Sequence, residues 1–254
     1  MKILVAIKEV PSRDSQLRVA SSGTWIEQDA LSYEINEPDA YALEEALQLK
    51  EKHGGEVIVL CAGPERASQT IREALAKGAD RAIHLVIEDA LDTLGLARLL
   101  AGAVASEKPD LILTGLQSDD IGSGQTGVVM AELLGMTHST IIMQVEVKDA
   151  AIRVKRELEG GWFQYIEMPL PAVLTIQSGL NKLRYATLMG IKKAKNKEVK
   201  KLVPADLGGV PVGVVATARI YAPKKNKQSQ IFAGDAKTAA AQLVEKLKFE
   251  ARIF

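Results

Sequence analysis

Short apolar runs alternate with longer amphipathic segments over the first half of the chain. Four runs are continuous and short, as in strands buried on both faces of a sheet: 3–7, 56–61, 82–86 and 111–114. Four segments with helical periodicity follow them: 38–53, 64–77, 90–106 and 125–134. Strands that alternate with helices in this way predict right-handed crossovers and a parallel sheet covered on both faces, as in a Rossmann-like α/β fold.

The segment 38–53 is the clearest of the predicted helices. Asn36 and Pro38 mark its start, and Gly54 and Gly55 mark its end. Its apolar side is formed by Tyr41, Leu43, Ala46, Leu47 and Leu49, while Glu44, Glu45 and Lys50 fall elsewhere on the helix. We therefore expect the three charged residues to lie away from the core.

The pattern changes after residue 140. Short alternating runs occupy 141–148, 151–158, 162–167 and 172–177. Gly160 and Gly161 separate two of them, and Pro169 and Pro171 precede the last. These features predict antiparallel strands added at the edge of the sheet.

The C-terminal part differs in composition from the rest. Residues 192–201 carry six lysines, and 204–236 are rich in proline, glycine and lysine. A last helix is predicted over 236–249, with Ala240, Leu243, Val244 and Leu247 on one face. This helix follows a long, poorly packed connection, so its stripe must be buried elsewhere on the domain or on a partner. We expect an α/β domain at 1–203 and an arm at 204–254 that contacts a partner subunit.

Composition narrows the possible functions. The 254 residues include 32 Lys and Arg against 32 Asp and Glu, so no overall positive field would attract nucleic acid. The single Cys61 excludes an intrachain disulfide or a cysteine-rich metal site, and it favours a reducing compartment such as the cytoplasm. No apolar stretch approaches 18 residues, so we expect no membrane insertion and no secretory signal.

The loop 115–127 is the most informative stretch for chemistry. It follows a predicted strand and precedes a helix, at the sheet edge where open α/β folds bind ligands. Its glycines let a ligand approach the backbone, and Ser123, Thr126 and the helix amides suit a phosphate. The alternative is a glycine-rich turn in which Ser123 only caps the helix. The loop lacks the Gly-Lys-Ser/Thr ending of a P-loop, so it offers no γ-phosphate chemistry.

No other residues form a catalytic set. The three histidines are scattered, Cys61 has no cationic neighbour in the sequence, and no third carboxylate joins Asp119 and Asp120 at metal-ligand spacing. Ribose contact or helix capping is the economical role for this aspartate pair, and we predict no metal and no catalytic residue. The lysine run admits a solvated face, a nucleic-acid patch or a docking surface for an acidic protein. It lacks interleaved aromatic residues, which disfavours nucleic acid.

A series of motifs in order resembles the beta subunit of electron-transfer flavoprotein. The matching segments are 2–8, 36–39, 42–46, 76–82, 156–161, 171–176 and 181–188. The likeness is colinear from residue 2 to about residue 200, so the series is far more specific than any one motif.

The resemblance implies a heterodimer with a larger alpha subunit that holds FAD. The beta subunit would bind AMP structurally, enclose part of the flavin and act as an electron carrier rather than an enzyme. The implied cofactor-binding positions are Ala6, Asn36, Glu37, Pro38, Asp39, Ala62, Gln117, Asp119, Asp120, Ile121, Gly122, Ser123, Gly124, Gln125, Thr126 and Gly127.

The resemblance also implies a recognition loop near 181–197. Its leucine, Leu188, would enter an apolar pocket on acyl-CoA dehydrogenase-type donors of fatty acid beta-oxidation, and electrons would pass on towards a quinone oxidoreductase. The implied partner-binding residues are Arg184, Tyr185, Leu188, Lys192, Lys193 and Lys195. Such a protein would work in the cytoplasm, or in the mitochondrial matrix.

Two alternatives remain open. A bifurcating member of the family would carry a second FAD in place of AMP, but it tends toward valine and proline at the positions of Thr126 and Val128. A stand-alone, stress-type adenine-nucleotide-binding protein would share the sheet and the loop, yet it would not need residues 150–254. The match is weaker at Leu183, where proline is commoner, and at 9–16, so no flavin contact is expected from 12–16.

Overall fold

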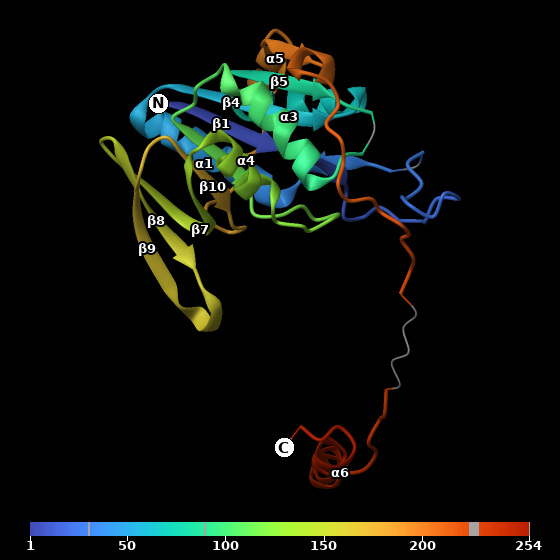
Figure 1. The fold of residues 1–254 in the computed structure, drawn as a ribbon. Helices are drawn as coiled ribbons and strands as arrows, with labels where there is room; N and C mark the ends of the chain where they lie inside the picture. Colours follow the sequence, from blue (N-terminus) through green and yellow to red (C-terminus); the bar gives the residue numbers. More distant parts are fainter. Residues whose placement is uncertain (30, 89, 224–228, 254) are drawn as a thin grey trace.

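The computed structural model describes residues 1–29, 31–88, 90–223 and 229–253. A nine-stranded sheet with helices on both faces forms the body, and an arm leads from it to a terminal helix that stands apart (Figure 1). The predicted Rossmann-like α/β fold is confirmed.

The large sheet has the strand order β11-β5-β4-β1-β6-β10-β7-β8-β9. The strand bounds are β1 Lys2–Ile7, β4 Glu56–Gly63, β5 Arg81–Val86, β6 Leu111–Gly115, β7 Thr137–Lys148, β8 Ala151–Glu157, β9 Phe163–Pro169, β10 Ala172–Ile176 and β11 Val199–Leu202. From β11 to β7 neighbouring strands are parallel, and β7, β8 and β9 pair antiparallel.

The chain reverses its direction of travel across the sheet at β1. It moves outward from β1 to β4 and β5, and then crosses back to place β6 on the other side of β1. In an open parallel sheet, such a switch point leaves a crevice at the carboxyl ends of the two strands. The ends of β1 and β6 are therefore where a ligand site is expected.

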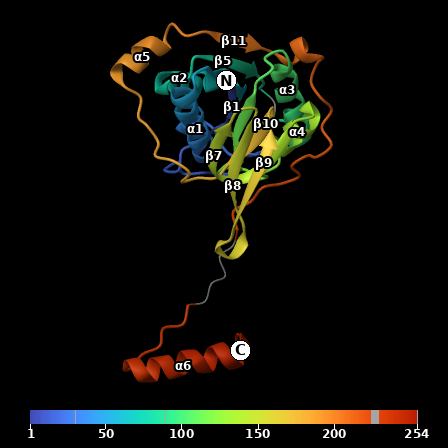
Figure 2. The same cartoon turned by 90° about the vertical axis from the view of Figure 1, so that its left-hand side faces the viewer.

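Two helices cover each face of the sheet (Figure 2). Helices α1 (Glu37–His53) and α2 (Ser68–Lys77) lie on one face, and α3 (Thr93–Ala105) and α4 (Thr126–Leu134) lie on the other. Alternate residues of β1 enter the two cores, with Ile3 and Val5 on the side of α1 and Leu4 on the side of α3. The four helices predicted from periodicity are confirmed, although 65–67 forms a separate 3-10 turn before α2.

The prediction of antiparallel edge strands is correct for β8 and β9 but wrong for 172–177. Strand β10 lies between β6 and β7 and is parallel to both. All five of its residues are buried, so its apolar run is that of a central strand rather than an edge strand. Strand β7 also starts earlier than predicted, at Thr137, and a register shift near Ile142 separates its pairing with β10 from its pairing with β8.

Several elements were not predicted from the sequence. A small ribbon joins β2 (Glu9–Pro11) to β3 (Tyr33–Ile35), and the lysine-rich region contains α5 (Leu188–Ala194) and β11. The lysine-rich region is therefore not solvated throughout, because Val199–Leu202 forms a strand of the sheet beside β5.

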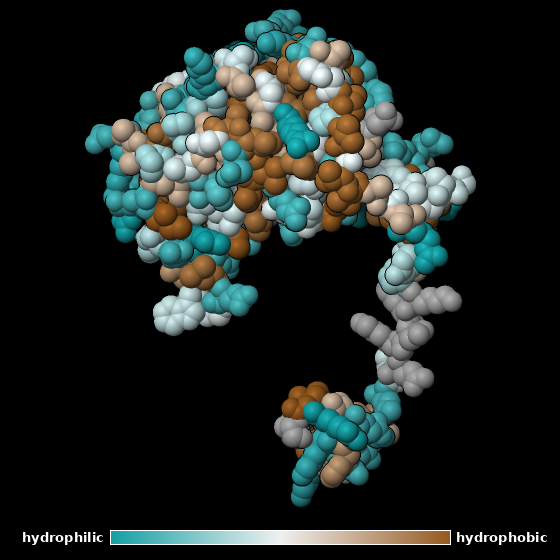
Figure 3. Space-filling model, in the orientation of Figure 1, coloured by the Kyte–Doolittle hydropathy of each residue, from teal (hydrophilic) through white to brown (hydrophobic). Residues whose placement is uncertain are grey.

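The first part of the arm packs along α3. Leu207 contacts Gly102, and the Asp92 carboxylate accepts the backbone N–H groups of Val214 and Val215 at 2.6 and 3.0 Å. Residues 224–228 and 254 of the predicted arm lie outside the described residues. Helix α6 (Ala236–Phe249) forms where predicted, yet it has no buried residue and stands away from the body (Figures 1 and 3).

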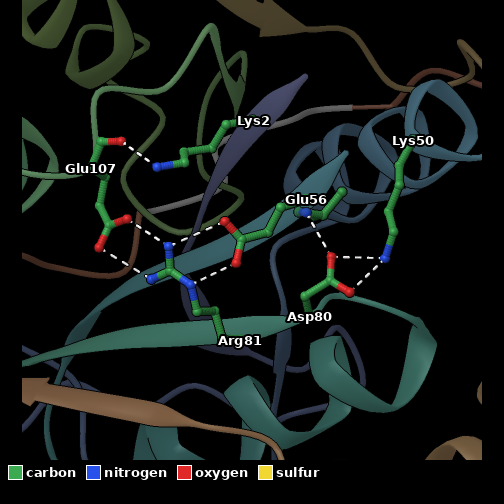
Figure 4. Close-up of polar contacts among 7 residues, drawn as sticks. Lys2, Lys50, Glu56, Asp80, Arg81 and Glu107 are labelled. Atoms are coloured by element: carbon green, nitrogen blue, oxygen red, sulfur yellow. Dashed lines mark hydrogen bonds and ion pairs between the residues drawn. The ribbon is translucent and has the colours of Figure 1, made fainter. Parts of the chain in front are cut away.

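Ion pairs brace the amino edge of the sheet, opposite the switch point (Figure 4). The Arg81 guanidinium donates to Glu56 at 2.8 Å and to Glu107 at 2.6 Å, and Lys2 Nζ donates to the Glu107 carbonyl at 2.8 Å. These contacts join the starts of β1, β4 and β5 to the loop before β6. These side chains thus fix the edge of the sheet that lies opposite the expected ligand site.

Candidate functional site

A cleft of about 820 Å³, including its open mouth, lies at the carboxyl edge of the sheet. Residues that follow β1, end β4 and follow β6 form its floor, and the first turns of α3 and α4 form its walls. Its place at the switch point is that of a small-ligand site.

Asp39 joins the two strand ends at the floor of the cleft. Its carboxylate accepts the Lys8 N–H at 2.7 Å and the Gly115 N–H at 2.8 Å, so one side chain fastens the end of β1 to the end of β6. Burial raises the pKa of Asp39 to about 7, and the two backbone N–H groups oppose that shift. Both oxygens are occupied, which leaves Asp39 as a structural brace rather than a proton donor to a ligand.

Asn36 holds the loop that forms the mouth of the cleft. This buried side chain donates from Nδ2 to the Gln117 carbonyl at 2.9 Å and accepts the Asp119 N–H at Oδ1, also at 2.9 Å. Both bonds span more than 80 residues of sequence, so the start of α1 sets the position of the loop after β6.

Lys8 supplies the ammonium group of the cleft, and Asp120 engages it. The distances from Lys8 Nζ to the two carboxylate oxygens are 2.6 and 2.7 Å, and Ser118 Oγ lies at 3.4 Å. Burial opposes ionisation of Asp120, but the hydrogen bonds from Lys8 and Ser118 outweigh it and lower the pKa of this carboxyl. The pair therefore ties the loop to β1 and leaves little free positive charge.

The backbone N–H groups at the start of α4 have no side-chain acceptor among the described residues, whereas amides earlier in the loop are bonded to Asn36, Ser118 and Asp120. The N-cap of α4 is Gln125, and no side chain caps that end, so the alternative in which Ser123 only caps the helix is wrong. A Cβ on Gly127 would lie 2.6 Å from Thr114 Oγ1, so this position has room only for glycine. Helix N–H groups that lack a side-chain acceptor are suited to bind an anion.

Apolar residues line the remainder of the cleft. Leu91 just before α3 and Leu96 and Leu100 on α3 line it, together with the small residues Ala6 and Ala62 near the ends of β1 and β4. Apolar lining thus lies next to a helix end whose N–H groups lack a side-chain acceptor.

The cleft brings together most of the cofactor residues expected from the sequence. Those that line it are Ala6, Asn36, Asp39, Ala62, Gln117, Ile121, Ser123, Gly124, Gln125, Thr126 and Gly127. Those outside the lining are Glu37, Pro38, Asp119, Asp120 and Gly122. Glu37 pairs with Arg13, and the Asp119 carboxylate lies 3.6 Å from the same guanidinium.

Sequence reasoning missed Lys8 and the wall from α3. Lys8 directly follows β1 and could have been found because residues after a central parallel strand face the ligand edge. The leucines of α3 carried no such signal, because an apolar helix stripe predicts burial against the sheet and not exposure to a cleft.

The expected partner-binding residues lie far from the cleft in sequence and form a separate surface. The segment expected as a loop is helical from Leu188 to Ala194, and Tyr185 and Leu188 are 93% and 83% exposed. Lys192, Lys193 and Lys195 are exposed as well.

Arg184 is held by acidic residues of this chain. It pairs with Glu44 at 2.7 Å and with Glu51 at 2.6 Å. Glu44 and Glu45 are buried, so the expectation that these α1 residues lie away from the core is wrong. The segment around Arg184 covers that side of α1, where Asn181 also donates to Glu45 at 3.1 Å.

Other reactive groups are placed in the interior. Burial raises the pKa of the Cys61 thiol to about 12, and His84 lies inside β5 within hydrogen-bond distance of the Gly63 carbonyl at 3.2 Å. Within the described ranges, no three His, Cys, Asp or Glu residues group as metal ligands. None of the described helices combines the length and apolar character needed to cross a bilayer.

Fold and cleft together define a Rossmann-like α/β protein with a candidate ligand site at its switch point and an extended C-terminal arm. Residues 24–207 match the family model described as the electron transfer flavoprotein domain. The chain is 39% identical over 256 residues to the electron transfer flavoprotein subunit beta of Bradyrhizobium diazoefficiens, with both chains covered in full.

Two further relatives give the same result. The corresponding subunit of Homo sapiens is 37% identical over 258 residues, covering 100% of this chain and 99% of the relative. That of Methylophilus methylotrophus is 36% identical over 258 residues, covering 96% and 97%. The chain therefore belongs to the electron-transfer flavoprotein family, in its beta-subunit branch, and the predicted resemblance is confirmed.

Proposed function

We propose that this chain is the beta subunit of a heterodimeric electron-transfer flavoprotein that binds AMP as a structural ligand. The observation that carries the proposal is the cleft itself, which combines free helix amides and an apolar slot with no free catalytic group. A larger alpha subunit holds FAD, and this chain helps to enclose that flavin. The chain is thus an electron carrier without catalytic residues of its own.

The charge of the cleft supports a phosphate-bearing ligand. Lys8 is neutralised by Asp120, so the α4 amides, Ser123 and Thr126 must balance most of the phosphate charge. Helix N-termini stabilise an anion, so the start of α4 suits a phosphate group. The residues Gln125, Thr126 and Gly127 also differ from the tendency of the bifurcating type.

Ligand release from the heterodimer tests this proposal. The chain is co-expressed with its alpha subunit, and the yellow complex is heated to release small molecules for chromatography. One AMP and one FAD per heterodimer are expected. Two FAD would place the protein in the bifurcating class, and a monomer with nucleotide but no flavin would support the stand-alone alternative.

A pair of glycine variants links the released nucleotide to the cleft. Gly127→Ala places a methyl group against Thr114 Oγ1, whereas Gly102→Ala meets Leu207 only at an ordinary 3.7 Å. Loss of AMP is expected from the first variant alone. Equal AMP content in both would place the nucleotide somewhere other than this cleft.

The arm supports assembly with the alpha subunit. Val210, Val212, Val214 and Val215 are exposed, and the apolar stripe of α6 has no cover among the described residues. Figure 3 shows apolar residues gathered on the face that carries α3 and α4. A partner subunit that covers both surfaces would bury this apolar area.

Leu188 is proposed to anchor an acyl-CoA dehydrogenase-type donor, with Tyr185 beside it and Lys192, Lys193 and Lys195 steering the encounter. Arg184 instead secures this segment to α1. Electrons then pass towards a quinone oxidoreductase, and the expected compartment is the cytoplasm or the mitochondrial matrix.

The test compares Leu188→Ala with Leu158→Ala, which truncates an exposed leucine just after β8. An anchor leucine contributes about 2 kcal/mol, so flavin reduction by the donor should slow about 30-fold only in the first variant. Unchanged flavin content and thermal stability in both variants would exclude a folding defect. Equal reduction rates in both would remove Leu188 from the donor interface.

A further inference from the structure

The exposed apolar surface around Leu188 stands on a helix too short to hold itself. Tyr185, Leu188, Met189 and Ile191 are 93%, 83%, 61% and 46% exposed, and three of them belong to the seven-residue α5. Isolated helices of this length do not form in water. The position of the surface must therefore come from what lies beneath α5.

Gly190 lets α5 approach α2 closely. A Cβ at this position would lie well inside van der Waals distance of the Ala76 carbonyl oxygen, near the end of α2. Ala194, at the end of α5, is only 3% exposed. Two small residues thus bring one side of α5 onto α2 and leave Leu188 and Met189 facing solvent.

Two cations cross between the helices and cap each other's carboxyl ends. Arg72 of α2 donates to the Ala194 carbonyl at 2.6 Å and to the Lys197 carbonyl at 3.1 Å. Lys197, just after α5, donates to the Leu75 and Ala79 carbonyls at 2.9 and 2.5 Å. Each pair satisfies carbonyls that a helix end leaves open and places positive charge at the negative end of the dipole.

Lys197 differs from the other lysines nearby. Lys192, Lys193 and Lys195 are exposed, and no hydrogen bond or ion pair joins their ammonium groups to another described residue. The Lys197 ammonium is half-buried between two carbonyl oxygens and is occupied within the chain. A single lysine-rich segment therefore contains both free surface charge and an internal fastening.

We propose that Gly190, Arg72 and Lys197 are positioning residues that fix the docking surface around Leu188 for the electron-donor protein. The inference rests on the proposed donor interface at Leu188. A surface that is rigid before contact loses less conformational entropy on binding. The contacts of Gly190, Arg72 and Lys197 therefore raise the affinity for the donor without touching it. The donor meets Leu188 and Met189, while the fastening lies on the opposite side of α5.

The test uses the FAD-loaded heterodimer and an acyl-CoA dehydrogenase reduced by its acyl-CoA substrate. Lys197→Met keeps the aliphatic stem and removes both carbonyl contacts. Its KM for the heterodimer should rise about tenfold, the loss expected for a charge-assisted hydrogen bond, at unchanged kcat. Lys197→Arg should restore most of the affinity, and Gly190→Ala should behave like Lys197→Met because its methyl group displaces α5.

A measurement without the donor separates positioning from charge. Hydrogen exchange of the peptide 186–198 should be faster in Lys197→Met than in wild type, and unchanged in the matched variant Lys195→Met. Lys195→Met should instead reduce the salt dependence of the association rate. Equal exchange in the two variants would refute the proposal that Lys197 holds α5 against α2.

Leu188→Ala distinguishes failure of this inference from failure of the donor interface. If Leu188→Ala leaves the reaction unchanged, the interface itself is wrong. If Leu188→Ala raises KM but Lys197→Met does not, the interface stands and the positioning role is overturned. In the double variant, an effect smaller than the product of the single effects is expected, because both changes act through one surface; fully multiplicative effects would contradict the inference.

Discussion

Asn36→Ala tests whether the loop after β6 is the part of the cleft that binds the nucleotide. The wild-type side chain is 1% exposed and makes two hydrogen bonds of 2.9 Å to the loop backbone. Alanine keeps the helix in register but removes both bonds, so the segment from Gln117 to Asp119 loses its connection to α1.

The magnitude follows from the two bonds. Each neutral hydrogen bond stabilises the native state by about 1 kcal/mol, so the variant should lose about 2 kcal/mol. The freed Gln117 carbonyl and Asp119 N–H can reach water once the loop moves, which keeps the loss from being larger. If ordering this loop is required for binding, the same 2 kcal/mol lowers the AMP affinity by up to about 30-fold.

Two measurements on the purified heterodimer check this result. Urea denaturation gives the change in stability, and bound AMP after dialysis against a series of AMP concentrations gives the affinity. The variant Asn36→Asp is the matched control of equal size. Its ionised carboxylate still accepts the Asp119 N–H but faces the Gln117 carbonyl without a proton to donate.

AMP binding by Asn36→Asp should depend on pH. Ionised aspartate at this position should weaken AMP binding more than alanine does, since it repels both the carbonyl and the phosphate. As the pH falls through the pKa of that new carboxyl, the protonated group can donate to Gln117, and binding should partly recover. A loss of stability with unchanged AMP affinity in both variants would show that the loop does not bind the nucleotide.

Three other perturbations have defined outcomes. Removal of 235–254 deletes α6 and should weaken assembly with the alpha subunit, measured by gel filtration, while AMP content stays near wild type; full assembly would show that α6 has another purpose. Arg81→Met leaves Glu56 and Glu107 facing each other without their shared cation and should cost about 2 kcal/mol in urea denaturation at low salt. The hydrogen bond from Arg81 lowers the pKa of Glu107, so this pair stabilises the fold above the ordinary glutamate pKa of about 4.3 and less as the pH falls through the lower folded value. The difference in the free energy of unfolding between Arg81→Met and wild type should therefore be smaller at acid pH than at pH 7. Asp92→Ala removes the acceptor of Val214 and Val215 and should increase protease cleavage of the arm, whereas Asp235→Ala, which removes only the cap of α6, should not free residues 210–215.

Local patterns in the sequence identified most of the body. Continuous apolar runs such as 56–61 and the periodic segment 38–53 fix their own secondary structure, because burial on two faces or one face has a definite residue spacing. The place of the loop 115–127 at the cleft could be predicted for a similar reason, since the loop that follows a central strand of a parallel sheet lies at the edge where ligands bind.

Strand order and pairing direction could not be obtained in the same way. Strand β10 was expected at an antiparallel edge, yet it lies between β6 and β7 and is parallel to both. An apolar strand can pair with any neighbour of the same character, and the choice depends on how the helices cover the two faces. The burial of Glu44 and Glu45 could not be predicted locally either. The segment that covers them comes from far along the chain, and its Arg184 lies 140 residues from Glu44.

The amino-acid pattern thus specified the alternating α/β architecture, the glycine-rich loop that lines the cleft and the separate C-terminal helix, all of which depend on residues near one another in the chain. The cleft wall formed by α3, the Lys8–Asp120 pair and the Asn36 clamp arise only when the chain reverses at β1 and brings distant segments to one sheet edge. The same holds for Lys197, whose place in a lysine-rich run indicates a solvated charge. Packing of α5 on α2 gives it carbonyl partners instead, because the open ends of two helices meet there.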